Sequence, residues 1–391
     1  MGNVTSILAS AVNAPSGLWV IILNWIESGI VNYGWTILLF TLLLKVVLSP
    51  LDFLMKYSTK KQTLVQQKLA PQMARLQKKY ANNQQEYQAQ VNAMYKREGY
   101  NMVTSCLVML VNMIITMVVF FTMFGSLRDV SAYKAINQYE SLKTTYEQTM
   151  TSNLKTTIDN VNFDAEDFDL SAFLQNDTNK TTYATQINSA KAATEAELLK
   201  TWNGSKDSWL WVKNIWVADG AKSTMPSYPD LQKIVGDAGV GEYNDYVNNI
   251  DQFIYSEIEN IVGSSETSWN GYYILAILSA VVTFLSQWVS QLSTKLKKKE
   301  LNKMAENPAQ NGAMMKFMKI LLPAIMVIFV ISSSASFGIY IVSSSLISIL
   351  ITYLTGLIVN AMFKKKEEEV ISYLEKESLK QIKKKNKKQG V

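Results

Sequence analysis

The side chains that most often carry enzyme chemistry are scarce in this chain of 391 residues. It contains no histidine and a single cysteine, Cys106. A disulfide within the chain, a Cys/His zinc site and every histidine-dependent catalytic arrangement are therefore excluded. The sequence also lacks a Walker-type glycine-rich loop, which indicates that no nucleotide drives its work. We therefore expect a protein that is not an enzyme and that holds neither a cofactor nor a metal.

One ionisable side chain, Lys45, stands in the middle of a long apolar stretch. Thr41 and Ser49 flank it at four-residue spacing, which places all three on one face of a helix. A charge at the centre of a bilayer costs roughly 3 kcal/mol or more, and apart from Asp52 near the end of the same stretch we find no Asp or Glu within the apolar stretches to pair with it. The lysine could instead extend its long stem toward the polar side near Asp52. We favour a water-filled groove that solvates the charge.

Polar residues also follow one face of three other apolar stretches, whereas residues 320–331 have none. Polar groups inside a membrane are costly and mark functional surfaces. Together with the lysine face they predict a hydrophilic groove formed by Lys45, Thr41, Ser49, Asn112, Thr116, Thr283, Gln287, Tyr340, Ser343 and Ser344. The alternative for the Ser and Thr residues is ordinary helix–helix packing, which needs no water.

The elements that must position these residues are membrane-spanning helices. A span needs roughly 20 predominantly apolar residues. Segments 34–54, 101–127 and 271–292 meet this requirement, and segment 318–363 is long enough to cross twice, with a division at Ser332–Ser336. The sequence therefore predicts an all-α polytopic membrane protein with five transmembrane helices around the groove.

Lysine and arginine are concentrated in alternate connecting segments, and this bias sets the predicted orientation. Residues 55–100 hold nine basic residues against two acids, and the tail 364–391 holds ten lysines against five glutamates. Residues 128–270 hold 11 basic and 21 acidic residues, and residues 1–33 hold no Lys or Arg. We therefore expect segments 55–100, 293–317 and 364–391 in the cytoplasm, and segments 1–33 and 128–270 outside.

Three connecting segments carry local predictions. Residues 18–30 predict a short amphipathic helix on the outer surface. Residues 55–100, rich in Gln, Lys and Ala, predict a cytoplasmic helical hairpin without an apolar face large enough for a core. Residues 128–270 predict a mostly helical external insertion. We expect its Trp209, Trp211 and Trp216 at the level of the lipid headgroups, where indole rings are favoured.

Short motifs recur along the chain in a fixed order. They are Thr36–Leu51, Met94–Lys96, Asn101–Cys106, Leu210–Lys213, Tyr272–Leu275, Met314–Pro323 and Tyr340–Ser343. As an ordered set, over residues 17–125 and 208–365, they resemble the YidC family, the bacterial arm of the Oxa-type membrane insertases. Lys45 lies at the position of the family's groove arginine. Asn101–Cys106 departs from the family's pattern because it lacks the Pro and the Gly, and the external insertion is longer than usual.

The resemblance implies a membrane protein insertase and chaperone of the bacterial plasma membrane that works without nucleotide hydrolysis. It implies nascent membrane proteins and the lipid bilayer as partners, with the ribosome at the hairpin and basic tail and the Sec translocon as further candidates. The main alternative is a transporter or channel in which Lys45 attracts an anion. A Ser/Lys intramembrane protease and a membrane-anchored scaffold are two others.

Overall fold

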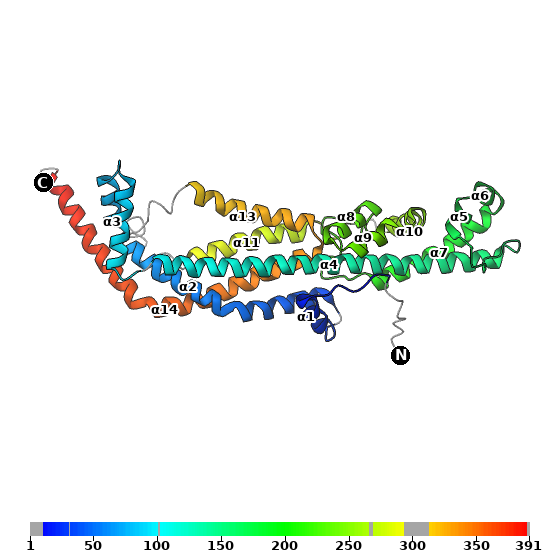
Figure 1. The fold of residues 1–391 in the computed structure, drawn as a ribbon, viewed down its shortest axis with the longest axis horizontal. Helices are drawn as coiled ribbons and strands as arrows, with labels where there is room; N and C mark the ends of the chain where they lie inside the picture. The colour runs from blue at the N-terminus through cyan, green and yellow to red at the C-terminus, as the bar shows by residue number, and fades with distance from the viewer. Residues whose placement is uncertain (1–10, 31, 101, 266–268, 293–312, 389–391) are drawn as a thin grey trace. The chain divides into compact units, whose positions relative to one another are not determined.

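The computed structural model describes residues 11–30, 32–100, 102–265, 269–292 and 313–388 (Figure 1). Every regular element in these ranges is a helix, and the only extended pairings among them are two isolated bridges. The predicted all-helical class is confirmed. Most of the predicted loop 293–317 lies outside the described residues.

Seven helices hold the apolar stretches and their polar extensions. They are α1 (Leu18–Glu27), α2 (Tyr33–Lys79), α3 (Gln84–Arg97), α4 (Met102–Thr157), α11 (Ile274–Leu292), α13 (Ala313–Ser332) and α14 (Ala335–Lys388). Three of them, α2, α4 and α14, are long and apolar enough to cross a membrane. The apolar parts of α11 and α13 are shorter in the described residues, at Ile274–Ser290 and Pro323–Ser332. The predicted third and fourth spans therefore stay predictions.

The long helices do not end where their apolar stretches end. Helix α2 includes both Pro50 and Pro71 and continues to Lys79, so the predicted boundary at residue 54 falls inside it. Helix α4 has 56 residues, about 84 Å at 1.5 Å per residue, and passes residue 127 without a break. Helix α14 likewise passes residue 363. Gln, Lys and Glu are good helix formers, so a change from apolar to polar residues gives the backbone no reason to stop.

The chain divides into two compact units, each built from three stretches of sequence. Unit 1 contains residues up to Phe40, Phe121–Leu278 and Val327–Ile341. Unit 2 contains Thr41–Phe120 and the described parts of 279–326 and 342–391.

Most of unit 1 is a helical domain around the C-terminal part of α4, from Phe121 onward. Its other helices are α5 (Leu170–Gln175), α6 (Asp177–Thr182), α7 (Ala184–Ser205), α8 (Tyr228–Ala238), α9 (Gly241–Asn248) and α10 (Gln252–Ser265). Along α4 the buried residues Tyr139, Leu142, Tyr146 and Met150 recur every three or four positions, the spacing of one helix face. This face packs into a single core with the other helices of the domain. Figure 1 shows α7 alongside the distal part of α4.

The polar extensions of unit 2 are held together by two small apolar cores. The end of α2 and α3 share one, which includes Met73, Val91 and Tyr95. Helices α2 and α14 share the other, which includes Leu64, Phe363 and Leu374. The expectation that residues 55–100 lack a core-forming face is therefore wrong. The apolar residues there are few, but α3 folds back so that they meet.

Candidate functional site

Lys45 lies on α2 and is half-buried, between the exposed side chains of Val46 and Val47 and the half-buried Leu44. None of the hydrogen bonds and ion pairs found among the described residues involves its ammonium group. Asp52, two turns further along the same helix, is the carboxylate whose charge acts on it. The charge of Lys45 is therefore compensated only along its own helix in this part of the chain, and not by an acid on another one.

The two hydroxyl residues predicted beside Lys45 differ in their surroundings. Thr41 is fully buried. Ser49 is half-buried, and its hydroxyl donates to the carbonyl of Val46 at 2.8 Å. This bond returns the hydroxyl to the backbone of its own helix, as serine often does inside helices. Ser49 therefore fits ordinary helix packing as well as it fits a groove.

The predicted residues of α4 lie toward a different part of α2. Asn112 donates from Nδ2 to the sulfur of Met55 at 2.9 Å, a direct contact between α4 and α2 within unit 2. Met55 is about 15 Å along the helix from Lys45, at 1.5 Å per residue. Thr116, one turn further along α4, is exposed. The structure brings α4 against α2, but the amide of Asn112 does not reach the lysine.

The remaining predicted residues lie on α11 and α14. Gln287 and Ser344 are half-buried and Ser343 is buried. The hydroxyl of Thr283 is buried and has no hydrogen-bond partner among the described residues, a situation that costs about 1–3 kcal/mol. Tyr340 is buried but belongs to unit 1, whereas the other nine belong to unit 2. Within the described chain no hydrogen bond joins Lys45 to any of the other nine predicted residues, Tyr340 included, so the groove stays a prediction.

An irregular segment between α7 and α8 organises the helix ends of unit 1, and sequence reasoning missed it. We call residues 207–225 the clasp. The carbonyls of Ile215 and Val217 accept from the backbone N–H groups of Ser336 and Ala335, both at 2.8 Å. The first N–H groups of a helix have no partner within it, so the clasp satisfies donors at the start of α14. Irregular loops of this length are uncommon and usually functional, which is the signal that could have found it.

A buried pair of asparagines fixes the shape of the clasp. Asn270 accepts the N–H of Asn214 at 2.8 Å and donates to the carbonyls of Asn214 and Ala218 at 2.8 and 3.0 Å. Asn214 donates in turn to Gln138 on α4 at 3.0 Å. Both asparagines are fully buried, so each bond replaces one that water would otherwise provide.

Asp219 joins the clasp to the start of α11. One of its carboxylate oxygens accepts from the backbone N–H of Leu275 at 2.9 Å. Burial raises the pKa of Asp219 to about 6, against the opposing effect of the Leu275 and Ala276 N–H groups. The clasp thus contacts the first turns of both α11 and α14.

The tryptophans of the clasp pack largely within the protein. Trp216 is fully buried, donates to Asp207 at 2.5 Å and packs edge-on against Tyr33. Trp209 is 8% exposed and lies so close to Gly34 that a Cβ there would be 2.3 Å from its ring. The protein itself covers these two indole rings, so they do not contact lipid, and their level relative to the headgroups stays a prediction. Trp211 is half-buried.

The family model described as 60Kd inner membrane protein matches residues 25–362 of the chain. The chain belongs to this family, the YidC/Oxa family. All ten predicted groove residues and the whole clasp lie within the match. The resemblance inferred from the ordered motifs is confirmed. Of those motifs, the side chain of Cys106 lies outside the described part of the structure.

Curated members of the YidC/Oxa family share shorter stretches with the chain. The membrane protein insertase YidC of Chlorobaculum tepidum is 32% identical over 107 residues, 27% of this chain and 18% of the relative. That of Treponema denticola is 38% identical over 94 residues, 24% of this chain and 15% of the relative. That of Helicobacter pylori strain 26695 is 30% identical over 115 residues, 29% of this chain and 20% of the relative. The chain thus matches about a fifth or less of each relative's length. No solved structure matches it.

Proposed function

We propose that this protein is a membrane protein insertase and chaperone of the bacterial plasma membrane. Membership of the YidC/Oxa family supports it, since the curated relatives carry that name. The observation that carries the proposal for this chain is Lys45, a half-buried cation on an apolar helix with no acid on another described helix to neutralise it. A stable membrane protein gains nothing from such a charge, because it costs roughly 3 kcal/mol or more. A substrate that carries a negative charge would be attracted by it.

In the proposed mechanism, the polar outer segment of a nascent chain enters a hydrophilic groove and is attracted by Lys45. Two unit charges 4 Å apart attract by about 4 kcal/mol where the effective dielectric constant is near 20. Thr41, Ser49, Asn112, Thr116, Thr283, Gln287, Tyr340, Ser343 and Ser344 would solvate that segment. The groove opens sideways, so the substrate's apolar span leaves directly into lipid.

Partition into lipid supplies the driving force, and no nucleotide is needed. Each Leu-like residue contributes about −0.5 kcal/mol, so a span of about 20 contributes roughly −10 kcal/mol. One acidic residue crossing the centre costs roughly 3 kcal/mol on the same scale. The balance favours insertion once the polar segment has a solvated path. The insertase lowers the free-energy barrier to insertion, and it supplies none of the driving free energy itself.

The partners follow from the charge distribution. The hairpin 55–100 and the tail from 364 are lysine-rich and suit contact with the phosphates of ribosomal RNA at the cytoplasmic face. The acidic segment 128–270 lies outside in this topology, with the N-terminus outside and the C-terminus in the cytoplasm. Cooperation with the Sec translocon is compatible with the proposal and is not required by it.

Substitution of Lys45 tests the mechanism. Purified protein in liposomes should insert a single-span substrate with an acidic outer tail. Lys45→Arg should retain insertion because the charge stays, although arginine adds a rigid fork that lysine lacks. Lys45→Leu and Lys45→Glu should slow insertion at least about tenfold, equivalent to about 1.4 kcal/mol. The same substrate with a neutral tail should be much less affected.

Lys61→Leu serves as the matched control, because Lys61 is an exposed lysine of the same helix. If Lys45→Leu inserts the acidic-tailed substrate at the wild-type rate, the groove charge is not the mechanism. If the liposomes instead pass small anions in a manner that depends on Lys45, the alternative of a transporter or channel is favoured.

A further inference from the structure

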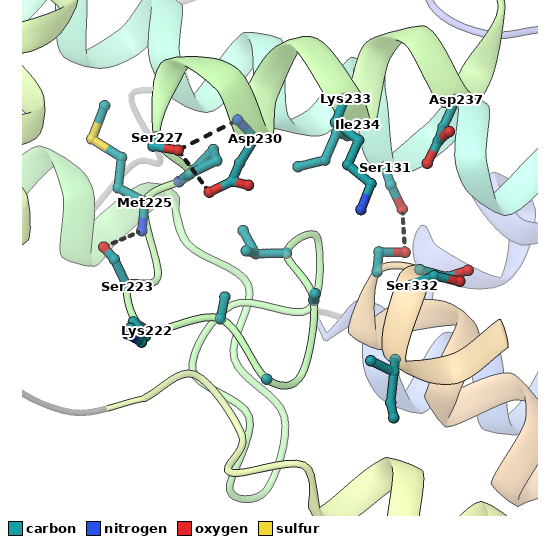
Figure 2. A pocket seen from close by; sticks show the side chains of 18 of the residues that line it. Ser131, Lys222, Ser223, Met225, Ser227, Asp230, Lys233, Ile234, Asp237 and Ser332 are labelled. Carbon is teal, nitrogen blue, oxygen red and sulfur yellow. Dashed lines mark hydrogen bonds between the residues drawn. The ribbon is translucent and has the colours of Figure 1, made fainter. Parts of the chain in front are cut away.

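Unit 1 contains a pocket of mixed polar and apolar lining beside the ends of α11 and α13 (Figure 2). Its volume is about 410 Å³. One wall is a single face of α8, on which Asp230, Lys233, Ile234 and Asp237 follow helical spacing. The opposite wall is the clasp, from Val217 onward, and the end of α13 with the turn before α14, residues 331–334, lines the pocket as well. The groove and the proposed mechanism do not use this pocket.

The acidic side chains of α8 are already engaged within the protein. Asp237 pairs with Arg128 of α4 at 3.2 Å. Asp230 accepts the hydroxyl of Ser227 at 2.6 Å, at the start of the helix. The ion pair neutralises the charge of Asp237, whereas Asp230 keeps its negative charge. The ligand must therefore be matched to the charges that remain.

Two cations of the lining remain available. Lys222 on the clasp and Lys233 on α8 take part in no ion pair among the described residues. Figure 2 shows Lys233 extending from α8 on the pocket side, between Asp230 and Asp237. Asp230 and Glu259 likewise form no ion pair within the described part of the chain. Apart from the Arg128–Asp237 pair, the lining thus offers two positive and two negative charges, which suits a zwitterionic ligand.

The hydroxyl of Ser223 adds a hydrogen-bond donor to the pocket lining. Ser223 accepts the N–H of Met225 at 3.2 Å, so its own O–H is left to donate. Two ammonium groups and a hydroxyl donor fit a phosphate, which accepts several hydrogen bonds and attracts cations. The carboxylate of Glu259 fits an ammonium group on the same ligand.

The pocket borders a band of exposed aromatic and apolar side chains. Tyr272 and Tyr273, which directly precede α11, are 53% and 38% exposed, and Ile331 near the end of α13 is 43% exposed. Trp269 is 36% exposed and packs edge-on against Tyr273. Aromatic rings of this kind collect where a bilayer meets water. If α11 and α13 cross the membrane, as the proposed function requires, the pocket lies at headgroup level.

Tyr273 itself is both part of this band and part of the pocket wall. Its ring lies against Gly220 of the clasp, where a Cβ would be 2.1 Å from the ring. Its backbone has φ near 60°, a conformation that non-glycine residues rarely adopt. The clasp and the start of α11 thus hold an aromatic side chain between the pocket and this exposed aromatic band.

We propose that this pocket binds the headgroup of a phospholipid of the outer leaflet. The phosphate lies at Lys222 and the Ser223 hydroxyl, Lys233 adds the second positive charge of the lining, and an ammonium group, as in phosphoethanolamine, lies toward Glu259. The volume is at the low end of the range for small-molecule sites, which suits a headgroup and not a whole lipid. The acyl chains lie outside, along Tyr273 and Ile331. This inference rests on the membrane topology of the proposed function.

Native mass spectrometry of the full-length protein in detergent tests this site, with dioleoyl-phosphatidylethanolamine as the probe. The double variant Lys222→Gln/Lys233→Gln should bind the lipid at least tenfold more weakly than the wild type. Lys222→Arg/Lys233→Arg keeps both charges and should retain binding, which separates loss of the site from loss of the fold. Lys200→Gln, at an exposed lysine of α7 outside the pocket, is the matched control and should bind like the wild type.

Three results would overturn the proposal. The first is equal lipid binding by the wild type and the glutamine double variant. The second is displacement of the lipid by inorganic phosphate at equal concentration, which would make the site one for a soluble phosphate. The third is displacement by an acidic peptide, which would make it a peptide site. Because the readout is lipid binding and not insertion, a negative result with Lys45→Leu leaves this test intact.

Discussion

Two lysines of α2 show how differently one residue type can be accommodated. Lys60 is buried and forms an ion pair with Glu367 at 3.1 Å, with side chains only 7% and 6% exposed. Lys45 is half-buried and has no such partner on another described helix. A buried charge is tolerated only when it is paired or when water or a ligand reaches it. The contrast makes Lys60 a structural residue and Lys45 the candidate for contact with substrate.

Asp219 carries a prediction of pH dependence. Burial raises its pKa from 3.8 to about 6, so between these values the folded state binds more protons than the unfolded state. Its contribution to the free energy of unfolding therefore falls as pH rises through this range. At about 1.4 kcal/mol per pKa unit, the full effect is about 3 kcal/mol.

The matched variant is Asp219→Asn, which keeps an oxygen for the Leu275 N–H but does not titrate. We expect the wild type to gain thermal stability relative to Asp219→Asn as pH is lowered from 7 to 4.5. Thermal unfolding of both proteins across this range provides the measurement, and other titrating groups cancel in the difference. Parallel stability curves would show that Asp219 does not titrate in this window.

Lys45 was predictable from the sequence, but the contacts of the clasp were not. A lysine inside an apolar stretch is visible without any structure, because its cost depends only on its surroundings. The contacts of the clasp depend on residues far apart in the chain, such as Asn214 and Asn270, which are separated by 56 positions. The burial of Trp216 depends on Asp207 and Tyr33 in the same way. No local pattern encodes such contacts.

At the scale of elements, the sequence predicted the apolar parts of the helices better than their ends. Hydropathy marks where a helix is suited to lipid, so the apolar parts of α2, α4 and α14 were found. The helix ends depend on backbone hydrogen bonding and on helix propensity, which hydropathy does not report. For that reason α2 and α14 continue beyond their apolar parts as polar helices that pack together.

The ion pair of Lys60 and Glu367 joins these two polar extensions. It leads to a prediction about thermal stability. Removing one partner of a buried ion pair leaves the other charge unpaired and costs about 3–5 kcal/mol, whereas replacing both with apolar residues is often neutral. We expect Lys60→Met alone to lower the thermal unfolding temperature clearly. The double variant Lys60→Met/Glu367→Met should recover most of the loss.

The more exposed pair of Arg75 and Glu377 on the same two helices is the control. The Arg75 side chain is 57% exposed, and Arg75→Met should cost no more than about 1 kcal/mol. If the single and double variants at positions 60 and 367 unfold at the same temperature, the two charges do not interact in solution.

At the scale of the whole molecule, the distribution of charge along the chain leads to one predicted membrane topology. Helices α2, α4, α11, α13 and α14 each contribute to both compact units. The acidic residues are concentrated in unit 1, in segment 128–270, and the lysine-rich hairpin and tail belong to unit 2. A membrane with a positive-inside bias therefore predicts opposite sides for the two sets of polar helices.

Labelling with a membrane-impermeant maleimide tests this topology directly. The chain has one cysteine, so Cys106→Ser provides a cysteine-free background. Asp177→Cys replaces a side chain that is 97% exposed at the start of α6, and Asn82→Cys replaces an exposed residue between α2 and α3. In intact cells stripped of any outer membrane, the first should be labelled and the second should react only after permeabilisation. Labelling of Asn82→Cys in intact cells would reverse the orientation, and the proposed headgroup pocket would then face the cytoplasmic leaflet.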